Sequence, residues 1–317
     1  MEKADVEAWV DLFEKVCKTR DVEILREINI GYNSRVYLVS VDGREYAVKK
    51  YNKRYNGSKV CIEEKDHIMK AKRAIPDAVP NVVLASEHAE NKFDREILVM
   101  KKANGEPLNG TTFDQQVFRE LVNILKRLHS TRTKRERKTC ELGRLGSCRS
   151  EMMRFLGRKE VIPQEKVSKH LDALERYYNQ NADMFTGSRT LIHGDLWWDN
   201  ILVDKDRITI VDWLESDEQN YCRDLAQLKI GTFDEILDAH ESKWFFDRVL
   251  TAYEEEFGDE CLRGKMRYYL PMMYLEESFY VPFKHFPWEI KYEENAEEFE
   301  YRFLTYFEES EKSLKYG

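Results

Sequence analysis

Residues 190–216, with the sequence TLIHGDLWWDNILVDKDRITIVDWLES, constrain the fold more than any other stretch of this chain. Two short apolar runs flank a polar turn at residues 204–207, a pattern typical of an antiparallel hairpin. If the turn is centred between its two middle residues, residues whose numbers sum to about 411 face each other. Asn200 then lies across from Val211 and beside Asp212, so the two polar side chains are expected to meet at the open end of the hairpin.

These polar residues indicate a specific chemistry. A carboxylate and an amide oxygen held together are hard oxygen ligands suited to Mg²⁺, which usually completes its coordination with water and substrate phosphate. Asn200 and Asp212 are therefore the predicted metal ligands of a nucleotide-magnesium site. Asp195 precedes Asn200 by five residues and can accept a proton from an attacking hydroxyl, so it is the candidate catalytic base.

The spacing of these residues matches a known pattern. Residues 193–200 read H-G-D-x-x-x-x-N and Asp212 opens D-W-L, which reproduces the spacing of the protein-kinase elements H-R-D-x-x-x-x-N and D-F-G. His193 is interpreted as a hydrogen-bonded residue that holds the loop rather than as a proton-transfer group. The motif resembles that of the aminoglycoside phosphotransferase and choline kinase family of kinase-like small-molecule phosphotransferases, over roughly residues 22–230.

The resemblance implies transfer of a γ-phosphoryl group from ATP, or from another nucleoside triphosphate, to a hydroxyl, with Mg²⁺ as cofactor. It also implies that Lys49, in the segment YAVKK, grips the α- and β-phosphates. Period-two alternation alone does not distinguish Lys49 from Lys50. A helix glutamate should pair with the lysine, and Glu64 is preferred over Glu63.

The resemblance further implies which residues bind the nucleotide. The loop that covers the phosphates retains one glycine of the protein-kinase pattern, Gly31, while Asn33 and Ser34 can supply backbone or hydroxyl donors. The adenine is expected to hydrogen-bond to the backbone of the connector from Met100 to Ala103. Family members also carry an Asp in a D-L-A segment that supports the catalytic loop, and residues 224–226 match it.

Hydrophobic periodicity indicates how the chain is organised. A helix is predicted over residues 4–18, β-rich segments follow from residue 22, and a helix over 58–74 precedes two short strands. The Gly- and Pro-containing stretch 103–111 is the predicted linker, and the chain beyond it is mostly helical, with one of the helices predicted over residues 233–257. The expected fold is α+β, a bilobal protein-kinase-like fold. It combines a small antiparallel-sheet N-lobe with one helix (residues 1–102) and a larger, mainly helical C-lobe (residues 103–317).

Composition limits the classes of function. The 317 residues include 51 basic and 59 acidic side chains, a net charge of -8 that argues against a general DNA-binding surface. No apolar run approaches the roughly 18 residues of a membrane helix, and no signal-peptide pattern opens the chain. The six scattered cysteines are interpreted as reduced thiols, so a cytoplasmic protein is expected. The family resemblance implies that its substrate is a small hydroxyl-bearing molecule.

Other segments leave alternatives open. Residues 126–159 contain twelve Lys or Arg against three Glu and could bind an anionic substrate or RNA, although a solvated loop is favoured. Residues 289–311 mix glutamates with aromatics and could hold a cationic acceptor, although an amphipathic terminal helix is favoured. An atypical kinase acting on protein or RNA and a non-catalytic nucleotide-binding scaffold are the alternative functions.

Overall fold

The structure of the chain is a computed structural model, and it describes residues 3–30, 34–131, 140–156, 161–186, 189–284 and 296–316. The chain forms two compact units. The first unit comprises the chain up to Leu128 together with His193–Asp217, and the second comprises His129–Ile192 and the chain from Glu218 onward. The division into a nucleotide-binding lobe (residues 1–102) and a catalytic and acceptor-binding lobe (residues 103–317) stays a prediction.

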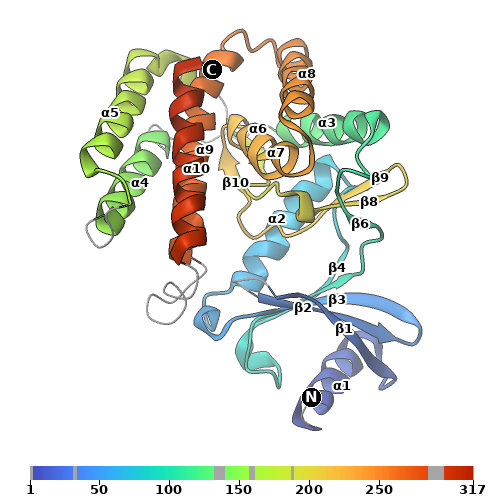
Figure 1. Cartoon of the computed structure of the whole chain (residues 1–317). Coiled ribbons are helices and arrows are strands. Elements are labelled where there is room, and N and C mark those ends of the chain that lie inside the picture. The colour runs from blue at the N-terminus through green and yellow to red at the C-terminus, as the bar shows by residue number, and fades with distance from the viewer. Residues whose placement is uncertain are drawn as a thin grey trace. The chain divides into compact units, whose positions relative to one another are not determined.

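A five-stranded antiparallel sheet organises the first unit (Figure 1), and its strand order is β1-β2-β3-β5-β4. The strands are β1 (Val22–Ile30), β2 (Ser34–Val41), β3 (Arg44–Tyr51), β4 (Val82–Ser86) and β5 (Ile97–Lys101). Two helices accompany the sheet, α1 (Lys3–Cys17) and α2 (Val60–Ala74). The predicted small antiparallel sheet with one inserted helix, preceded by an N-terminal helix, is confirmed.

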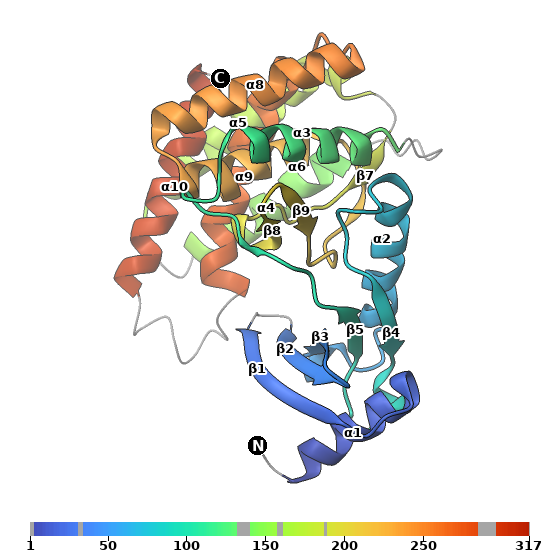
Figure 2. The ribbon, with the colours of Figure 1, turned by 90° about the vertical axis from the view of Figure 1, so that its right-hand side faces the viewer.

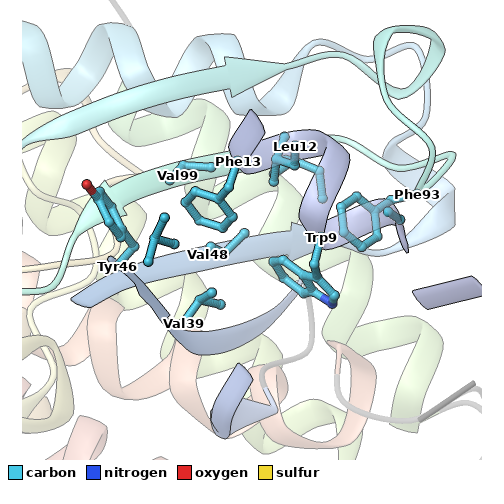
Figure 3. Close-up of a cluster of buried hydrophobic side chains, with 11 residues drawn as sticks. Trp9, Leu12, Phe13, Val39, Tyr46, Val48, Phe93 and Val99 are labelled. Carbon is cyan, nitrogen blue, oxygen red and sulfur yellow. The ribbon is translucent and has the colours of Figure 1, made fainter. Parts of the chain in front are cut away.

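Alternation along β3 divides its side chains between the two faces of the sheet. Tyr46 and Val48 join a buried apolar cluster with Trp9, Leu12 and Phe13 of α1 (Figure 3). The Trp9 ring packs edge-on against Phe93, with 4.7 Å between ring centroids. Residues 49 and 51 face the other way, toward α2, which lies across the sheet from α1 (Figures 1 and 2). The strand therefore carries a hydrophobic core on one face and ionisable groups on the other.

A smaller sheet completes the first unit. It contains β6 (Glu106–Pro107), β8 (Ile201–Asp204) and β9 (Arg207–Ile210), in the order β6-β8-β9. The helix α3 (Gln115–His129) begins beside Asp114, whose carboxylate accepts the N–H groups of residues 116 and 117 at 2.8 Å and so caps the helix. The β9 strand is tied to the loop after α2, because the Ile210 N–H donates to the Ala78 carbonyl.

The described part of the second unit is mainly helical, as predicted. Its elements are α4 (Cys140–Leu156), α5 (Gln164–Gln180), β7 (Thr190–Ile192), β10 (Asp217–Gln219), α6 (Cys222–Leu228), α7 (Asp234–Ile236), α8 (Ala239–Phe257), α9 (Leu262–Lys284) and α10 (Ala296–Tyr316). A π-helical turn, Lys229–Phe233, joins α6 to α7. None of the helices described is both long and apolar enough to cross a membrane.

Two helices of the second unit differ from the sequence-based expectation. The helix predicted over residues 233–257 is interrupted, because Asp238 is extended and its carboxylate caps a new helix by accepting the N–H of His240 and Glu241. Part of the basic segment predicted as a loop forms α4. Its buried face is formed by residues three or four positions apart, Leu145, Cys148, Met152 and Leu156.

The packing of α1 on the sheet can be tested by truncating Phe13, which is fully buried. We expect Phe13→Ala to lower the free energy of unfolding by about 3–5 kcal/mol, because it leaves a cavity between α1 and β3. Leu25→Ala on β1, where the side chain is 40% exposed, should change it by less than about 0.5 kcal/mol. Urea denaturation measures both, and equal small effects would show that α1 is not part of this core.

Candidate active site

Lys49 lies at the centre of the ionisable face of β3. Its side chain is 3% exposed, and its Nζ donates to Glu64 Oε2 at 2.8 Å and to Asp212 Oδ1 at 2.6 Å. Burial alone would lower the pKa of Lys49, but the two carboxylates outweigh that effect and raise it. The ambiguity between the two lysines is thereby resolved, because Lys50 lies on the other face, with its Nζ 5.3 Å from the centroid of the Phe93 ring.

The partner of Lys49 on α2 is Glu64, as preferred, since Glu64 is fully buried whereas Glu63 is exposed. Burial raises the pKa of Glu64 above its usual value, although the Lys49 ammonium opposes this shift. The hydroxyl of Tyr51 also donates to Glu64 Oε2. Tyr51 was not among the predicted site residues, although its position two residues after Lys49 places it on the same face of the strand.

The hairpin formed by β8 and β9 has the predicted register. Ile201 pairs with Ile210 and Asp204 pairs with Arg207, so facing residues sum to 411. Beyond the last ladder pair, the Val211 N–H donates to the Asn200 carbonyl at 2.9 Å. This bond places Asn200 beside the residue that follows Val211, which is Asp212.

Asp212 occupies an unusual backbone conformation at the end of β9. Its φ is +62°, in the left-handed region, and its side chain is 37% exposed. Burial acts to raise the pKa of Asp212, but the Lys49 ammonium outweighs it, so the net pKa lies below the usual value. The carboxylate is thus kept ionised, as a cation ligand must be.

Asn200 presents the second oxygen. Its Nδ2 donates to the backbone carbonyl of Asp195 at 2.9 Å and to Asp195 Oδ2 at 3.0 Å. Both partners are hydrogen-bond acceptors, so the amide nitrogen of Asn200 must be the atom that faces them. The amide oxygen of Asn200 then remains available to coordinate a cation. Among the residues described, no group of three His, Cys, Asp or Glu side chains could hold a metal. Two hard oxygen ligands nevertheless fit Mg²⁺, which takes its other ligands from phosphate and water.

Asp195, the candidate base, lies in a strongly negative environment. Burial raises the pKa of Asp195 to about 7, with further contributions from the charges of Asp212, Glu215 and Asp199, while the bond from Asn200 acts in the opposite direction. A pKa in this range suits a group that must accept a proton near neutral pH. The influence of Glu215 and Asp199 was not anticipated from the motif, which marks neither residue.

His193 and Gly194 shape the loop that carries Asp195. The His193 ring is buried, its Nε2 lies 3.0 Å from the Val211 carbonyl, and its Nδ1 accepts the Asp195 N–H at 3.2 Å. These partners require a neutral ring protonated on Nε2, which agrees with its interpretation as a loop-holding residue. Gly194 has φ +82°, and a Cβ there would lie 2.3 Å from the Glu215 carbonyl oxygen. That close approach explains why glycine occupies the position where protein kinases have arginine.

Of the predicted nucleotide-binding residues, Ser34 on β2 and Met100 on β5 lie in the five-stranded sheet. Ser34 is 5% exposed and pairs directly with Tyr51 across β2 and β3, whereas Gly31 and Asn33 lie outside the described residues. In the connector, Met100 is part of β5, and the N–H groups of residues 101 and 102 donate to carbonyls of residues 81 and 45. No hydrogen bond to the Ala103 N–H comes from the part of the chain that the structure describes, so this donor can bind a nucleotide base.

The second unit contains a separate buried polar network around Asp224 of the D-L-A segment. His129 Nε2 lies 3.0 Å from Asp224 Oδ2, and His129 Nδ1 lies 2.7 Å from the Tyr253 hydroxyl. The imidazole therefore bridges a buried carboxylate and a phenol, which ties α6 to α8 and to the last residue of α3. Support of the catalytic loop by Asp224 stays a prediction.

The two segments left open by the sequence are partly described. In α4, Arg144 pairs with Glu276 and Arg149 pairs with Asp172 and Glu175, so these cations are neutralised within the second unit. The densest basic run, residues 134–138, lies outside the described residues. In α10, Phe303 and Phe307 are buried, which supports the amphipathic-helix interpretation, and residues 289–295 also lie outside the described residues.

Comparisons with known proteins agree with this geometry. A model of the phosphotransferase enzyme family matches residues 24–269, more than half of the chain. The chain belongs to that family. The predicted resemblance is confirmed, as is the α+β, protein-kinase-like fold class with its small antiparallel sheet and mainly helical remainder. Among curated proteins, none matches the chain.

Solved structures share the fold at low sequence identity. A putative aminoglycoside phosphotransferase from Ralstonia eutropha is 12% identical, with a TM-score of 0.68 over 97% of this chain and 98% of that chain. A choline kinase from Cryptosporidium parvum is 14% identical, with a TM-score of 0.64 over 98% and 97%. A thermostable mutant of aminoglycoside phosphotransferase APH(4)-Ia, in ternary complex with AMP-PNP and hygromycin B, is 14% identical, with a TM-score of 0.63 over 96% and 97%.

The raised pKa of Asp195 implies a stability cost that can be measured on the metal-free protein. Between the ordinary value of 3.8 and about 7, the folded protein holds a proton that the unfolded chain releases, so stability falls as pH rises through this window. Asp195→Asn should therefore stabilise the protein by up to about 4 kcal/mol at pH 8 and by almost nothing near pH 4. Urea unfolding in EDTA measures this, with Asp206→Asn in the exposed hairpin turn as control. A pH-independent difference would contradict the shift.

The contact at Gly194 yields a second test. Gly194→Ala combines a left-handed backbone with a clash against Glu215, whereas Gly43→Ala, at φ +71° with nothing within 4 Å, carries only the backbone strain. We expect Gly43→Ala to cost about 1–2 kcal/mol and Gly194→Ala about 1–3 kcal/mol more. Equal losses in urea unfolding would show that the Glu215 backbone does not constrain position 194.

Proposed function

We propose that the protein transfers the γ-phosphoryl group of ATP to a hydroxyl of a small molecule. The observation that carries this proposal is the convergence, within the first unit, of Lys49, Asp195, Asn200 and Asp212. A family that contains phosphotransferases supports the type of reaction. The AMP-PNP bound by APH(4)-Ia supports a nucleoside triphosphate as donor.

Each residue has a distinct role in the proposal. Lys49 aligns the α- and β-phosphates, and Glu64 holds the Lys49 ammonium in place. Asn200 and Asp212 hold Mg²⁺, which when bound neutralises charge on the phosphate oxygens. Gly31, Asn33 and Ser34 contribute to the cover over the phosphates, and Met100 and Ala103 to the binding of the base.

Asp195 orients the acceptor hydroxyl and takes its proton. Its carboxylate is held by Asn200, and its main-chain N–H is held by His193, so the side chain has a defined direction before any substrate arrives. Catalysis then depends mainly on positioning and on charge neutralisation, because phosphoryl transfer requires little covalent chemistry from the protein. The hygromycin B and choline named for fold relatives support a small hydroxyl-bearing acceptor.

Two substitutions separate the base from the metal ligand. Asp195→Ala should lower kcat by about 10²–10⁴-fold while leaving the Kd of Mg-AMP-PNP within about twofold, because the base contacts the acceptor and not the nucleotide. Asp212→Ala should instead weaken Mg-AMP-PNP binding about tenfold or more, because it removes a charged metal ligand. Asp206→Ala, in the exposed hairpin turn, is the matched control.

ADP release across a panel of sugars, amino alcohols, aminoglycosides and nucleosides identifies the acceptor and gives kcat, and calorimetry gives the Kd. Unchanged turnover in Asp195→Ala would remove this residue from the mechanism. Mg-AMP-PNP binding by the wild-type protein without transfer to any member of the panel would favour the scaffold alternative.

A further inference from the structure

The hydroxyl of Tyr51 lies beside the proposed phosphate-binding lysine without any role assigned to it so far. Tyr51 is 1% exposed, follows Lys49 by two residues on the same face of β3, and donates its hydroxyl to Glu64 Oε2. The Lys49 ammonium donates to that same oxygen and lies 5.4 Å from the centroid of the Tyr51 ring. One carboxylate oxygen thus receives both donors.

The other carboxylate oxygen of Glu64 receives neither of these hydrogen bonds. Glu64 Oε1 is buried and has no hydrogen-bond partner among the described residues. The orientation of the carboxylate is therefore set by the two bonds to Oε2, one from Lys49 and one from Tyr51. Burial raises the pKa of Tyr51 well above its usual value, so the phenol remains a neutral donor.

Nucleotide binding would change the hydrogen-bond partners of Lys49. In the structure, Lys49 divides its ammonium between Glu64 and Asp212. If Asp212 binds a magnesium ion and Lys49 binds phosphate oxygens, the hydrogen bond between Lys49 and Asp212 is lost. Glu64 is then the remaining protein group that holds the Lys49 ammonium. A carboxylate held by Lys49 alone would then be free to follow the ammonium, whereas the Tyr51 hydroxyl, on the rigid strand β3, holds it in place.

We propose that Tyr51 is a positioning residue of the nucleotide site, which keeps the Glu64 carboxylate in place so that Lys49 can engage the phosphates. This inference rests on the proposed function, because it assumes that Lys49 binds a nucleotide. It places Tyr51 beside the phosphate cover as well, since Tyr51 pairs directly with Ser34 on the neighbouring strand.

Tyr51→Phe tests the inference, since it keeps the ring and removes only the hydroxyl. We expect the Kd and the KM of the magnesium-nucleotide to rise about tenfold, because a buried hydrogen bond to a charged group is lost. The acceptor KM should stay within about twofold, because Tyr51 and Glu64 are both buried and act, in this inference, only on Lys49. Tyr46→Phe is the matched control: it removes a tyrosine hydroxyl from the opposite face of the same strand, where the Tyr46 hydroxyl lies 3.6 Å from Cys17 Sγ. It should leave both constants unchanged.

A double-mutant cycle with Glu64→Gln shows whether the effect passes through Glu64. Calorimetry with Mg-AMP-PNP should detect no further loss when Tyr51→Phe is added to Glu64→Gln, and an equal loss in both backgrounds would overturn the inference. Wild-type affinity in Tyr51→Phe would overturn it while leaving the proposed function intact. No Mg-AMP-PNP binding by the wild-type protein would contradict the proposed function and the inference together.

The cycle remains decisive if Tyr51→Phe fails to fold. Folding restored in the double variant, which no longer buries a charged carboxylate at position 64, would show that the hydroxyl is needed to hold Glu64 and would support the inference. A double variant that also fails to fold, beside a folded Glu64→Gln, would show a role of the hydroxyl independent of Glu64 and would overturn it.

Discussion

The arrangement of the first unit depends on the contacts of the buried Lys49 ammonium with Glu64 and Asp212. The ammonium joins three elements that are far apart in the sequence: the strand β3, the helix α2 through Glu64, and the segment after β9 through Asp212. Removing one member of such a buried group leaves an uncompensated charge, so the three residues are expected to act as one unit. The same contacts that organise the fold therefore position the groups that we propose bind phosphate and metal.

The two aspartates that flank the β8–β9 hairpin, Asp195 and Asp212, have pKa values that are shifted in opposite directions. Lys49 keeps Asp212 ionised, with a lowered pKa, whereas burial, with a further contribution from nearby carboxylates, raises the pKa of Asp195 to about 7. One aspartate is thus suited to bind a cation and the other to accept a proton. The burial and the charge repulsion that raise the pKa of Asp195 also destabilise the folded protein when this carboxylate is ionised.

The relative positions of Asn200 and Asp212 could be predicted from the sequence because the hairpin pairs residues that are close together in the chain. Two apolar runs around a short polar turn determine which residues face each other, and this was enough to place Asn200 next to Asp212. The five-stranded sheet followed from β-branched and aromatic runs separated by clear turn residues, and the inserted helix followed from its apolar periodicity.

The remaining features depend on contacts between distant segments. Lys49 could not be distinguished from Lys50 until α1 and α2 were seen to cover opposite faces of the sheet. Tyr51 shares a face with Lys49, but its bond to Glu64 arises from the tertiary position of α2. The helix α4 was hidden by its many charges, although its buried residues recur at helical spacing.

The central claim is that Lys49, and not its neighbour, belongs to a magnesium-nucleotide site. Calorimetric titration of Mg-AMP-PNP into the wild-type protein, Lys49→Met and Lys50→Met tests it most directly. The expected result is binding to the wild-type protein and to Lys50→Met with similar Kd, and a Kd raised about tenfold or more in folded Lys49→Met, because a charge-assisted contact to phosphate is lost. Equal affinities for all three proteins, or no binding by the wild-type protein, would contradict the account.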